Sequence, residues 1–333
     1  MNKLTFFLQG LCLILLCHCN SNKGLSKKLS AGSWVEIESS DASLPIKRHE
    51  AAFVGVGDNF YLLGGRRINP VSIFNLKSQK WTDGAASPIE LHHFQPVVIG
   101  QDIYIIGALT GPYPGETPVP NILIYHTESD TWEQGPSIPE NRQRGGAGAV
   151  LYDGKIYLVC GIKDGHRGDH KNWLDVYDPI TGEWEQLADA PRPRDHFQAA
   201  VVGDRLFALA GRTTMSADNP FKHTIGEVDV YDFQTKTWST IDQSIPTQRA
   251  GNYVQVVGDE ILVFGGETYE QEQAHSEVEA LNVHDFTWRA LPAMLQGRHG
   301  TGAILYQNQI YTASGCGKHG GQPELTSMEC FVF

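Results

Sequence analysis

Basic side chains recur at one place in a pattern that repeats roughly every 50 residues, and they are the first candidates for chemistry. An Arg or a His stands just before an apolar run in each repeat. The set comprises Arg48, His92, Arg144, Arg194, His196, Arg249, Arg298 and His299. Guanidinium groups bind carboxylates and sulfates through paired hydrogen bonds. If these side chains converge, we expect a site for an anionic ligand; otherwise each Arg bonds only to loop carbonyls or to a neighbouring repeat.

A carboxylate follows one Gly-Gly pair of the same pattern. Glu267 comes directly after Gly265-Gly266, and His275 lies further along the same loop. A carboxylate and an imidazole in one loop can take part in proton transfer or ligand binding, so Glu267 and His275 are candidate site residues, His275 for ligand binding. The alternative for Glu267 is an exposed loop carboxylate. One carboxylate and one His make a poor set of metal ligands, and we expect no metal site.

Trp173 stands apart from the other six Trp residues, in a loop rich in Gly, His and Arg. An aromatic face with polar neighbours suits a sugar ring, so Trp173 is a candidate binding platform. The alternative is a loop anchor that packs against the adjacent repeat.

The composition excludes several other classes of function. The net charge is −12, from 26 Lys and Arg against 38 Asp and Glu. Nucleic-acid binding requires clustered cations, so we expect no nucleic-acid partner. The chain also lacks a Gly-x-Ser-x-Gly elbow, a P-loop and a Cys-x-x-Cys pair, and we expect no cofactor.

Each repeat predicts the same four strands. A first apolar run ends in a Gly or Asp turn, a second ends at Gly-Gly, a third ends near Tyr-Asp, and a fourth carries a Trp. Six of the seven Trp residues occupy this last place. The sixth repeat stops at Phe333 before its Trp strand, while a lone strand over residues 34–37 precedes the first repeat. Pairing that strand with the final repeat closes a ring and removes exposed strand edges.

The repeated Gly-Gly, Tyr-Asp and Trp positions resemble those of the kelch repeat. The resemblance covers residues 34–333 and implies an all-β fold, a six-bladed kelch β-propeller whose last blade is closed by the N-terminal strand. It also implies that the first strand of each blade lines a central channel. The basic side chains, the loops that follow Gly-Gly and the loop over residues 163–173 are then expected at one mouth of that channel.

Resemblances within this family imply two classes of function. Bacterial N-acetylneuraminate epimerases, which are exported six-bladed kelch proteins, are similar in a Gly-Glu after a second strand with an Arg six residues further on. Glu267 matches that Glu, which implies Glu267 as the candidate catalytic residue, an acid and base for opening of a sugar ring. Gln273 stands in place of the Arg. The resemblance implies an acidic sugar or glycan bound at a cationic mouth and, if the protein is an enzyme, epimerase- or mutarotase-like chemistry. The alternative is a non-catalytic module that binds a protein partner at the cell surface.

Two metal-dependent kelch chemistries match poorly. Plant specifier proteins resemble this chain in a Glu-x3-Asp-x3-His pattern for iron, but Gln271 replaces the Asp here. Galactose oxidase needs a Cys–Tyr cross-link and a Tyr2His2 copper site, and no matching constellation can be assigned. We therefore do not expect an oxidase.

The N-terminus has the features of a targeting segment. Residues 4–16 form an apolar stretch too short to cross a bilayer, and Cys19 and a polar segment follow. This resembles a bacterial lipoprotein signal peptide over residues 1–19, with residues 20–33 as a linker and a lipid on Cys19 as the only membrane attachment. His18, where a small residue is usual, leaves plain secretion and an uncleaved anchor as alternatives. We expect an exported protein, either an outer-membrane lipoprotein or a periplasmic or extracellular one.

Cysteines are too few in the rest of the chain for a disulfide framework. Cys316 and Cys330 lie on neighbouring candidate strands, so either a single disulfide or two separate buried thiols is expected.

Overall fold

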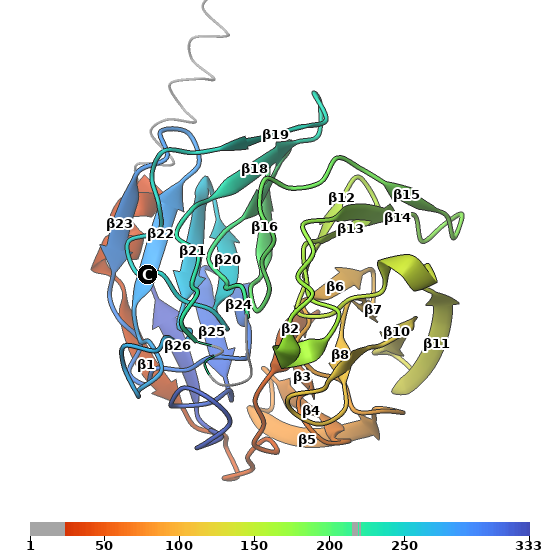
Figure 1. The fold of residues 1–333 in the computed structure, drawn as a ribbon. Coiled ribbons are helices and arrows are strands. Elements are labelled where there is room, and N and C mark those ends of the chain that lie inside the picture. Colours follow the sequence, from red (N-terminus) through yellow and green to blue (C-terminus); the bar gives the residue numbers. More distant parts are fainter. Residues whose placement is uncertain (1–23, 215–218, 220) are drawn as a thin grey trace, which may run out of the picture.

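The fold is a closed ring of sheets. The structure, a computed structural model, describes residues 24–214, 219 and 221–333. Six four-stranded antiparallel sheets are arranged around a central axis (Figure 1). The first strand of each sheet contacts the first strands of both neighbouring sheets, which closes the ring. The six-bladed β-propeller predicted from the repeats is confirmed.

The first three blades follow the chain without interruption. Blade 1 contains β2 (Ala51–Val56), β3 (Asn59–Gly64), β4 (Pro70–Asn75) and β5 (Lys80–Ala86). Blade 2 contains β6 (Pro96–Ile99), β7 (Asp102–Ile105), β10 (Asn121–His126) and β11 (Thr131–Ser137), with a small hairpin of β8 (Leu109–Thr110) and β9 (Thr117–Pro118) between β7 and β10. Blade 3 contains β12 (Gly148–Tyr152), β13 (Lys155–Val159), β14 (Leu174–Tyr177) and β15 (Trp184–Gln186).

Blades 4 and 5 repeat this order, and blade 6 takes its last strand from the start of the chain. Blade 4 contains β16 (Ala199–Val202), β17 (Arg205–Ala208), β18 (Asp229–Asp232) and β19 (Thr237–Thr240). Blade 5 contains β20 (Tyr253–Val257), β21 (Glu260–Phe264), β22 (Val278–Asn282) and β23 (Trp288–Leu291). Blade 6 contains β24 (Ala303–Tyr306), β25 (Gln309–Ala313), β26 (Met328–Val332) and β1 (Ser33–Ile37). Two 3-10 helices, η1 (Glu140–Arg142) and η2 (Gly165–Arg167), lie in connecting segments.

Closure by the N-terminal strand is confirmed in its register. β1 pairs antiparallel with β26, and Trp34 lies opposite Phe331. The Trp34 indole N–H donates to the carbonyl oxygen of Pro292 in blade 5 at 2.9 Å, which ties the closing strand to the preceding blade. The other five Trp residues of the repeat also lie on fourth strands, as their spacing predicts.

The hydrophobic core is divided among the blade interfaces. Six clusters of buried apolar side chains lie between successive blades, so each sheet is covered on both faces by its neighbours. Cys160, Cys316 and Cys330 are buried free thiols, the second of the two arrangements expected for the last pair.

The segment before the propeller is partly ordered against it. Residues 24–31, expected within a linker, are helical, and Leu29 is fully buried in the cluster between blades 5 and 6. The predicted signal peptide over residues 1–19 and its Cys19 lie outside the described residues. Within the described part of the chain, none of the helices has the length and apolar character needed to cross a membrane.

An Arg buried inside the sheet holds together five of the six blades. These residues are Arg48, Arg144, Arg194, Arg249 and Arg298, all fully buried. Each guanidinium donates to the carbonyl oxygen 16 residues later, where the second strand ends. In four blades it also contacts a carboxylate on the third strand, from Asp175, Asp229, Glu279 or Glu329.

These contacts correct the predicted ring of guanidinium groups at the mouth. Each Arg side chain turns into its own sheet, where carbonyl oxygens and, in four blades, a carboxylate compensate its charge. Burial lowers the pKa of Arg48 to about 10, so even this guanidinium, which contacts Ser72 in place of a carboxylate, remains charged at neutral pH. Bonding to backbone carbonyls, the alternative expectation for these arginines, is the arrangement observed.

Replacing one buried Arg should destabilise the whole ring. In Arg249→Leu the carboxylate of Glu279, now 2.5 Å from the guanidinium, would remain buried without a cation. Leaving such a charge unpaired typically costs about 3–5 kcal/mol of unfolding free energy. Urea unfolding followed by circular dichroism measures this loss.

The matched control is an ion pair at the surface. Lys77 pairs with Asp58 at 2.5 Å, but its side chain is mostly exposed, so Lys77→Met should leave the unfolding midpoint almost unchanged. Equal effects of the two substitutions would contradict the role given to the buried arginines.

Candidate functional site

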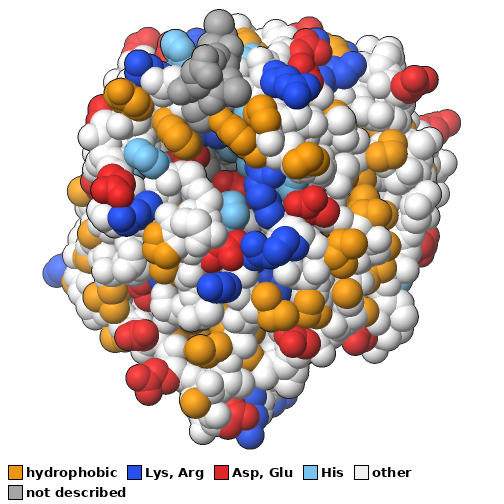
Figure 2. Space-filling model, turned by 60° about the horizontal axis from the view of Figure 1, so that its bottom comes forward, with side chains coloured by type: hydrophobic (Ala, Val, Ile, Leu, Met, Phe, Trp, Pro, Cys, Tyr) orange, Lys and Arg blue, Asp and Glu red, His pale blue; other side chains and the backbone are white. Residues whose placement is uncertain are grey.

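The channel opens into a cavity at one mouth. Figure 2 shows a hollow on this face in which basic, acidic and His side chains gather. The cavity has a volume of about 560 Å³, within the range usual for small-molecule sites. It is lined by His49, Glu50, Arg66, His93, Tyr113, His166, Arg212, Phe221, Glu267, Gly320, Gly321 and Gln322. The predicted gathering of post-glycine loops at one mouth is therefore present.

A ring of residues with left-handed backbone conformation surrounds the axis beneath this cavity. The residue two places after each buried Arg, or after Leu91 in blade 2, has a positive φ. The six residues and angles are Glu50 (54°), His93 (54°), Gly146 (59°), His196 (52°), Gly251 (64°) and Gly300 (64°). Glycine tolerates this conformation, whereas a residue with a side chain is strained by it. In three blades the backbone is therefore strained at the residue whose side chain lies at the axis.

Backbone hydrogen bonds link these six positions into a ring. The amide N–H of each residue donates to the carbonyl oxygen of the equivalent residue in the preceding blade, from His93 through Gly300, at 2.7–3.1 Å. The Ala51 amide completes the circuit with the Gly300 carbonyl at 3.0 Å. The side chains of Glu50, His93 and His196 consequently project from a rigid frame.

One polar cluster joins blades 5, 6 and 1. The His299 ring lies 3.5 Å from Glu50 Oε1 and 3.4 Å from Glu267 Oε2. Burial alone lowers the pKa of His299, but the charges of Glu267 and Glu50 outweigh it and raise that pKa well above its usual value. Burial likewise raises the pKa of Glu50, but its contact with the His299 imidazolium outweighs this effect and holds that pKa well below normal. An imidazolium therefore sits between two carboxylates at this wall.

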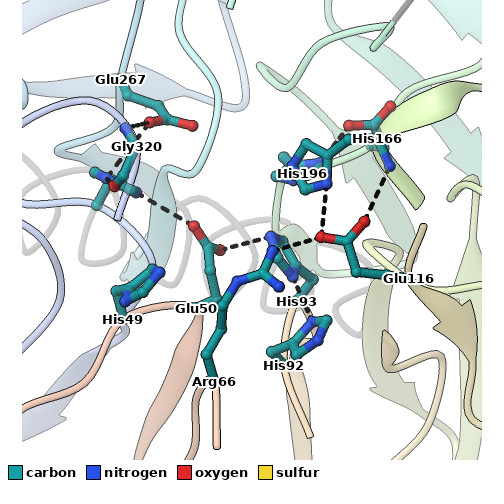
Figure 3. A network of polar contacts seen from close by, with 12 residues as sticks. His49, Glu50, Arg66, His92, His93, Glu116, His166, His196, Glu267 and Gly320 are labelled. Carbon is teal, nitrogen blue, oxygen red and sulfur yellow. Dashed lines mark hydrogen bonds and ion pairs between the residues drawn. The ribbon is translucent and has the colours of Figure 1, made fainter. Parts of the chain in front are cut away.

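A second polar cluster joins blades 2, 3 and 4 (Figure 3). Glu116, between β8 and β9, lies 2.9 Å from His166 Nδ1 in η2 and 2.5 Å from Arg66 Nη2. Burial raises the pKa of Glu116, but the hydrogen bonds and charges of His166 and Arg66 bring it below its usual range. His196 Nε2 lies 3.2 Å from His166 Nε2. The two clusters thus face each other across the cavity.

Arg212 connects the two clusters. Its Nη1 donates to Glu267 Oε1 at 2.8 Å, and its Nη2 lies 3.4 Å from His166 Nε2. Glu267 is 2% exposed and also accepts the Gly320 amide at 2.8 Å, so it is not the exposed loop carboxylate that was its alternative.

Five other predicted site residues do not line the cavity. His196 lies at the axis beneath it, and His299 contacts Glu50 and Glu267 behind its wall. The remaining three lie further away. His92 is buried behind His93, where its Nδ1 lies 2.7 Å from His93 Nδ1. His275 turns away to Thr268 and Glu277. The Trp173 ring is not an open platform, because the Arg142 guanidinium covers it at 4.0 Å from the ring centroid. Trp173 is better described as the loop anchor.

Glu50 and Glu116 are site residues that the sequence interpretation did not single out. Alignment of the repeats by their Arg would have found Glu50, because it occupies the place held by Gly in three other blades. Glu116 lies in a loop specific to blade 2, so no repeated signal marks it.

Comparison with known proteins decides the family. The family model described as the KLHDC2/KLHL20/DRC7 Kelch-repeats domain matches residues 18–211, more than half of the chain. The chain belongs to the kelch-repeat family. The solved structure titled "Structure of YjhT" superposes with a TM-score of 0.72 and 14% identity, over 87% of this chain and 96% of that one. At this identity the likeness concerns the fold.

Curated kelch relatives are longer than this chain. Kelch-like protein terF from Aspergillus terreus is 28% identical over 81% of this chain and 61% of its own length. Kelch-like protein 23 from Homo sapiens is 24% identical over 77% of this chain and 43% of its own length. The matched kelch region thus spans about half of these relatives.

The buried His side chains of the site predict that the propeller loses stability in acid. Burial lowers the pKa of His92 to about 4 and also lowers the pKa values of His93 and His196. Below about pH 6.5 these rings take up protons more readily in the unfolded chain than in the folded one, so their contribution to stability falls as pH falls. His299, whose pKa is raised, acts in the opposite direction, but it is one ring against three. Each ring contributes a loss of up to about 1.4 kcal/mol per pH unit. Urea unfolding between about pH 7 and pH 5 measures how steeply the unfolding free energy falls with pH.

Two comparisons check this assignment. His92→Asn should make the acid slope shallower, whereas His284→Asn, at an exposed surface position, should not. A wild-type unfolding free energy that is constant over this pH range would contradict neutral burial of these rings.

Proposed function

We propose that the protein binds a carbohydrate in the mouth cavity. The observation that carries the proposal is that Tyr113 and Phe221 share one cavity with the buried carboxylates of Glu50 and Glu267. Aromatic rings stack against the apolar faces of sugars, and carboxylates accept their hydroxyl groups in charge-assisted hydrogen bonds. The concave, partly enclosed shape suits a sugar unit better than an extended chain.

An acidic group on the sugar would have to interact with the guanidinium groups that remain at the cavity. These belong to Arg66 and Arg212, which already pair with Glu116 and Glu267. An acidic ligand must therefore compete with the protein's own carboxylates. We extend the proposal to acidic sugars on the strength of these two groups, and the binding test compares acidic with neutral sugars directly.

If the protein is an enzyme, we propose that it isomerises the bound sugar. Glu267 and Glu50 are candidate bases for a sugar hydroxyl, because contacts with His299 and other cations keep the pKa of each below its usual range despite burial. The adjacent His299 imidazolium can return a proton through the same network. Ring opening needs this pairing of proton acceptor and proton donor.

A protein partner is the second candidate, favoured by apolar side chains around the same mouth. Ile68, Tyr113 and Tyr269, on loops of blades 1, 2 and 5, are 60%, 50% and 52% exposed. Exposed apolar and aromatic residues of this kind are enriched in protein interfaces.

We also propose export with a lipid on Cys19, from the sequence of the N-terminal segment. Intact mass spectrometry of detergent-extracted protein should show a chain that begins at an acylated Cys19. Cys19→Ser should abolish the acyl mass, whereas Cys17→Ser should retain it. An unmodified chain that begins elsewhere would contradict the proposal.

Sugar binding should depend on the cavity aromatics. Isothermal titration with N-acetylneuraminate, glucuronate, galactose and N-acetylglucosamine should show saturable binding of at least one, weakened about 10-fold or more in Tyr113→Ala by loss of stacking. Exchange NMR of the bound sugar then tests isomerisation: its exchange rate should fall in Glu267→Gln if Glu267 acts as the base.

Tyr269→Ala is the matched control, because Tyr269 is equally exposed at the rim but does not line the cavity. Loss of sugar affinity in both Tyr variants, or in neither, would overturn the proposed binding mode. Absence of binding by all four sugars would favour the protein partner.

A further inference from the structure

Three imidazole rings from three blades meet at the base of the mouth cavity. His93 and His196 project from the axial ring in blades 2 and 4, and His166 reaches them from η2 in blade 3 (Figure 3). One ring nitrogen of each lies within 4.8 Å of the corresponding nitrogens of the others, and all three residues are buried. Imidazole nitrogens in such a group are ligands for zinc and other first-row transition metals.

The surrounding carboxylates favour one tautomer for two of the rings. Glu116 contacts His166 Nδ1 at 2.9 Å, and Asp195 accepts a hydrogen bond from His196 Nδ1. The carboxylate of Asp195 accepts a hydrogen bond, so His196 Nδ1 carries a proton and its Nε2 lone pair is free. Glu116 is a carboxylate beside His166 Nδ1 and favours a proton on that atom, although the pair lacks hydrogen-bond geometry. The two Nε2 atoms then face each other at the shared centre. Carboxylates that orient histidines in this way are the usual supporting shell of a metal site.

His93 is held in the same tautomer by a different partner. His92 Nε2 contacts the Gly111 carbonyl at 3.2 Å, so this nitrogen donates, and His92 Nδ1 accepts from His93 Nδ1 at 2.7 Å. The free His93 nitrogen, Nε2, then faces Glu50 Oε2 at 3.4 Å. Two acceptor atoms that face each other leave room for a cation.

The backbone provides an independent observation. His93 and His196 have φ values of 54° and 52° at positions where Gly146, Gly251 and Gly300 stand in other blades. A strained non-glycine residue persists where a side chain is needed, and such strain concentrates at functional sites. Glycine would satisfy the fold at both positions.

We propose that His93, His166 and His196 form a binding site for one divalent transition-metal ion, best represented by zinc, with an open coordination position toward the cavity. The inference rests on these residues and not on sugar binding. A tetrahedral zinc ion with Zn–N bonds of about 2.0–2.1 Å separates its ligand nitrogens by about 3.3 Å. The 3.2 Å between His166 Nε2 and His196 Nε2 already matches this spacing.

The charges around the site favour a cation. Four buried carboxylates line the two clusters, against two guanidinium groups and the His299 imidazolium: Glu50, Glu116, Asp195 and Glu267 face Arg66, Arg212 and His299. His170 Nε2 also contacts Asp195, at 3.2 Å, so Asp195 is shared by two His rings, and carboxylates outnumber the guanidinium groups around the site. Arg212 Nη2 lies 3.4 Å from His166 Nε2, and a metal ion bound to His166 would replace this weak contact. The guanidinium would still be held by Glu267, whose Oε1 lies 2.8 Å from Arg212 Nη1.

Metal binding by tag-free, full-length protein tests the proposal. After treatment with a chelator, isothermal titration with zinc chloride should show one site of micromolar or tighter affinity. Cobalt chloride should give the intense visible bands of tetrahedral coordination, and zinc should remove them. His166→Ala and the double variant His93→Gly/His196→Gly should each lose at least about 100-fold in affinity, and Glu116→Gln, which acts through His166, about 10- to 100-fold.

The variants are chosen so that loss of folding does not obscure the result. His166 lies in a connecting segment, and glycine relieves the strain at positions 93 and 196, so far-UV circular dichroism should be unchanged. His284→Ala, at the surface, is the matched control. Zinc held by Cys17 and Cys19 would be common to all variants. Absence of tetrahedral cobalt bands in the wild type, or equal zinc affinity in the wild type and the double glycine variant, would overturn the proposal.

Discussion

The left-handed ring at the channel axis is the constraint on which the rest of this propeller depends. Before each first strand the chain turns sharply, two residues after the buried Arg or, in blade 2, after Leu91. The repeated positive φ makes that turn, and hydrogen bonds between successive blades link the six turns into a circuit. Because glycine makes the turn without strain, any other residue at this position needs a reason of its own.

The buried arginines and the axial side chains have different roles in each repeat. The Arg turns into its sheet and binds the carbonyl that ends the second strand, while the residue two places later turns to the axis. The Arg therefore stabilises the blade, and the residue two places later supplies a side chain to the site. Glu50, His93 and His196 use the second position, and loops of blades 2 to 6 bring Glu116, His166, Arg212, Glu267 and Gly320 to them.

Sequence periodicity predicted the architecture well, because strand number and ring closure depend on features that every repeat carries. Trp34 at the start of the chain and the missing Trp strand at its end were sufficient to predict the closed blade. The site was harder to predict, because a recurring Arg does not reveal which way its side chain points. Arg144 and His196 were grouped as equivalent in sequence, yet one lies inside a sheet and the other at the axis. Glu116 was missed, because a blade-specific loop has no counterpart to compare.

Strain at the axis can be measured by replacing the non-glycine residues of the ring. The triple variant Glu50→Gly/His93→Gly/His196→Gly removes left-handed strain of about 1–2 kcal/mol per residue, against a cost of about 0.5–1 kcal/mol for each added glycine. We predict an unfolding free energy, from urea denaturation near neutral pH, that equals or exceeds that of the wild type. A loss of more than about 3 kcal/mol would show that these side chains support the fold, and would contradict the conclusion that they are kept for a site.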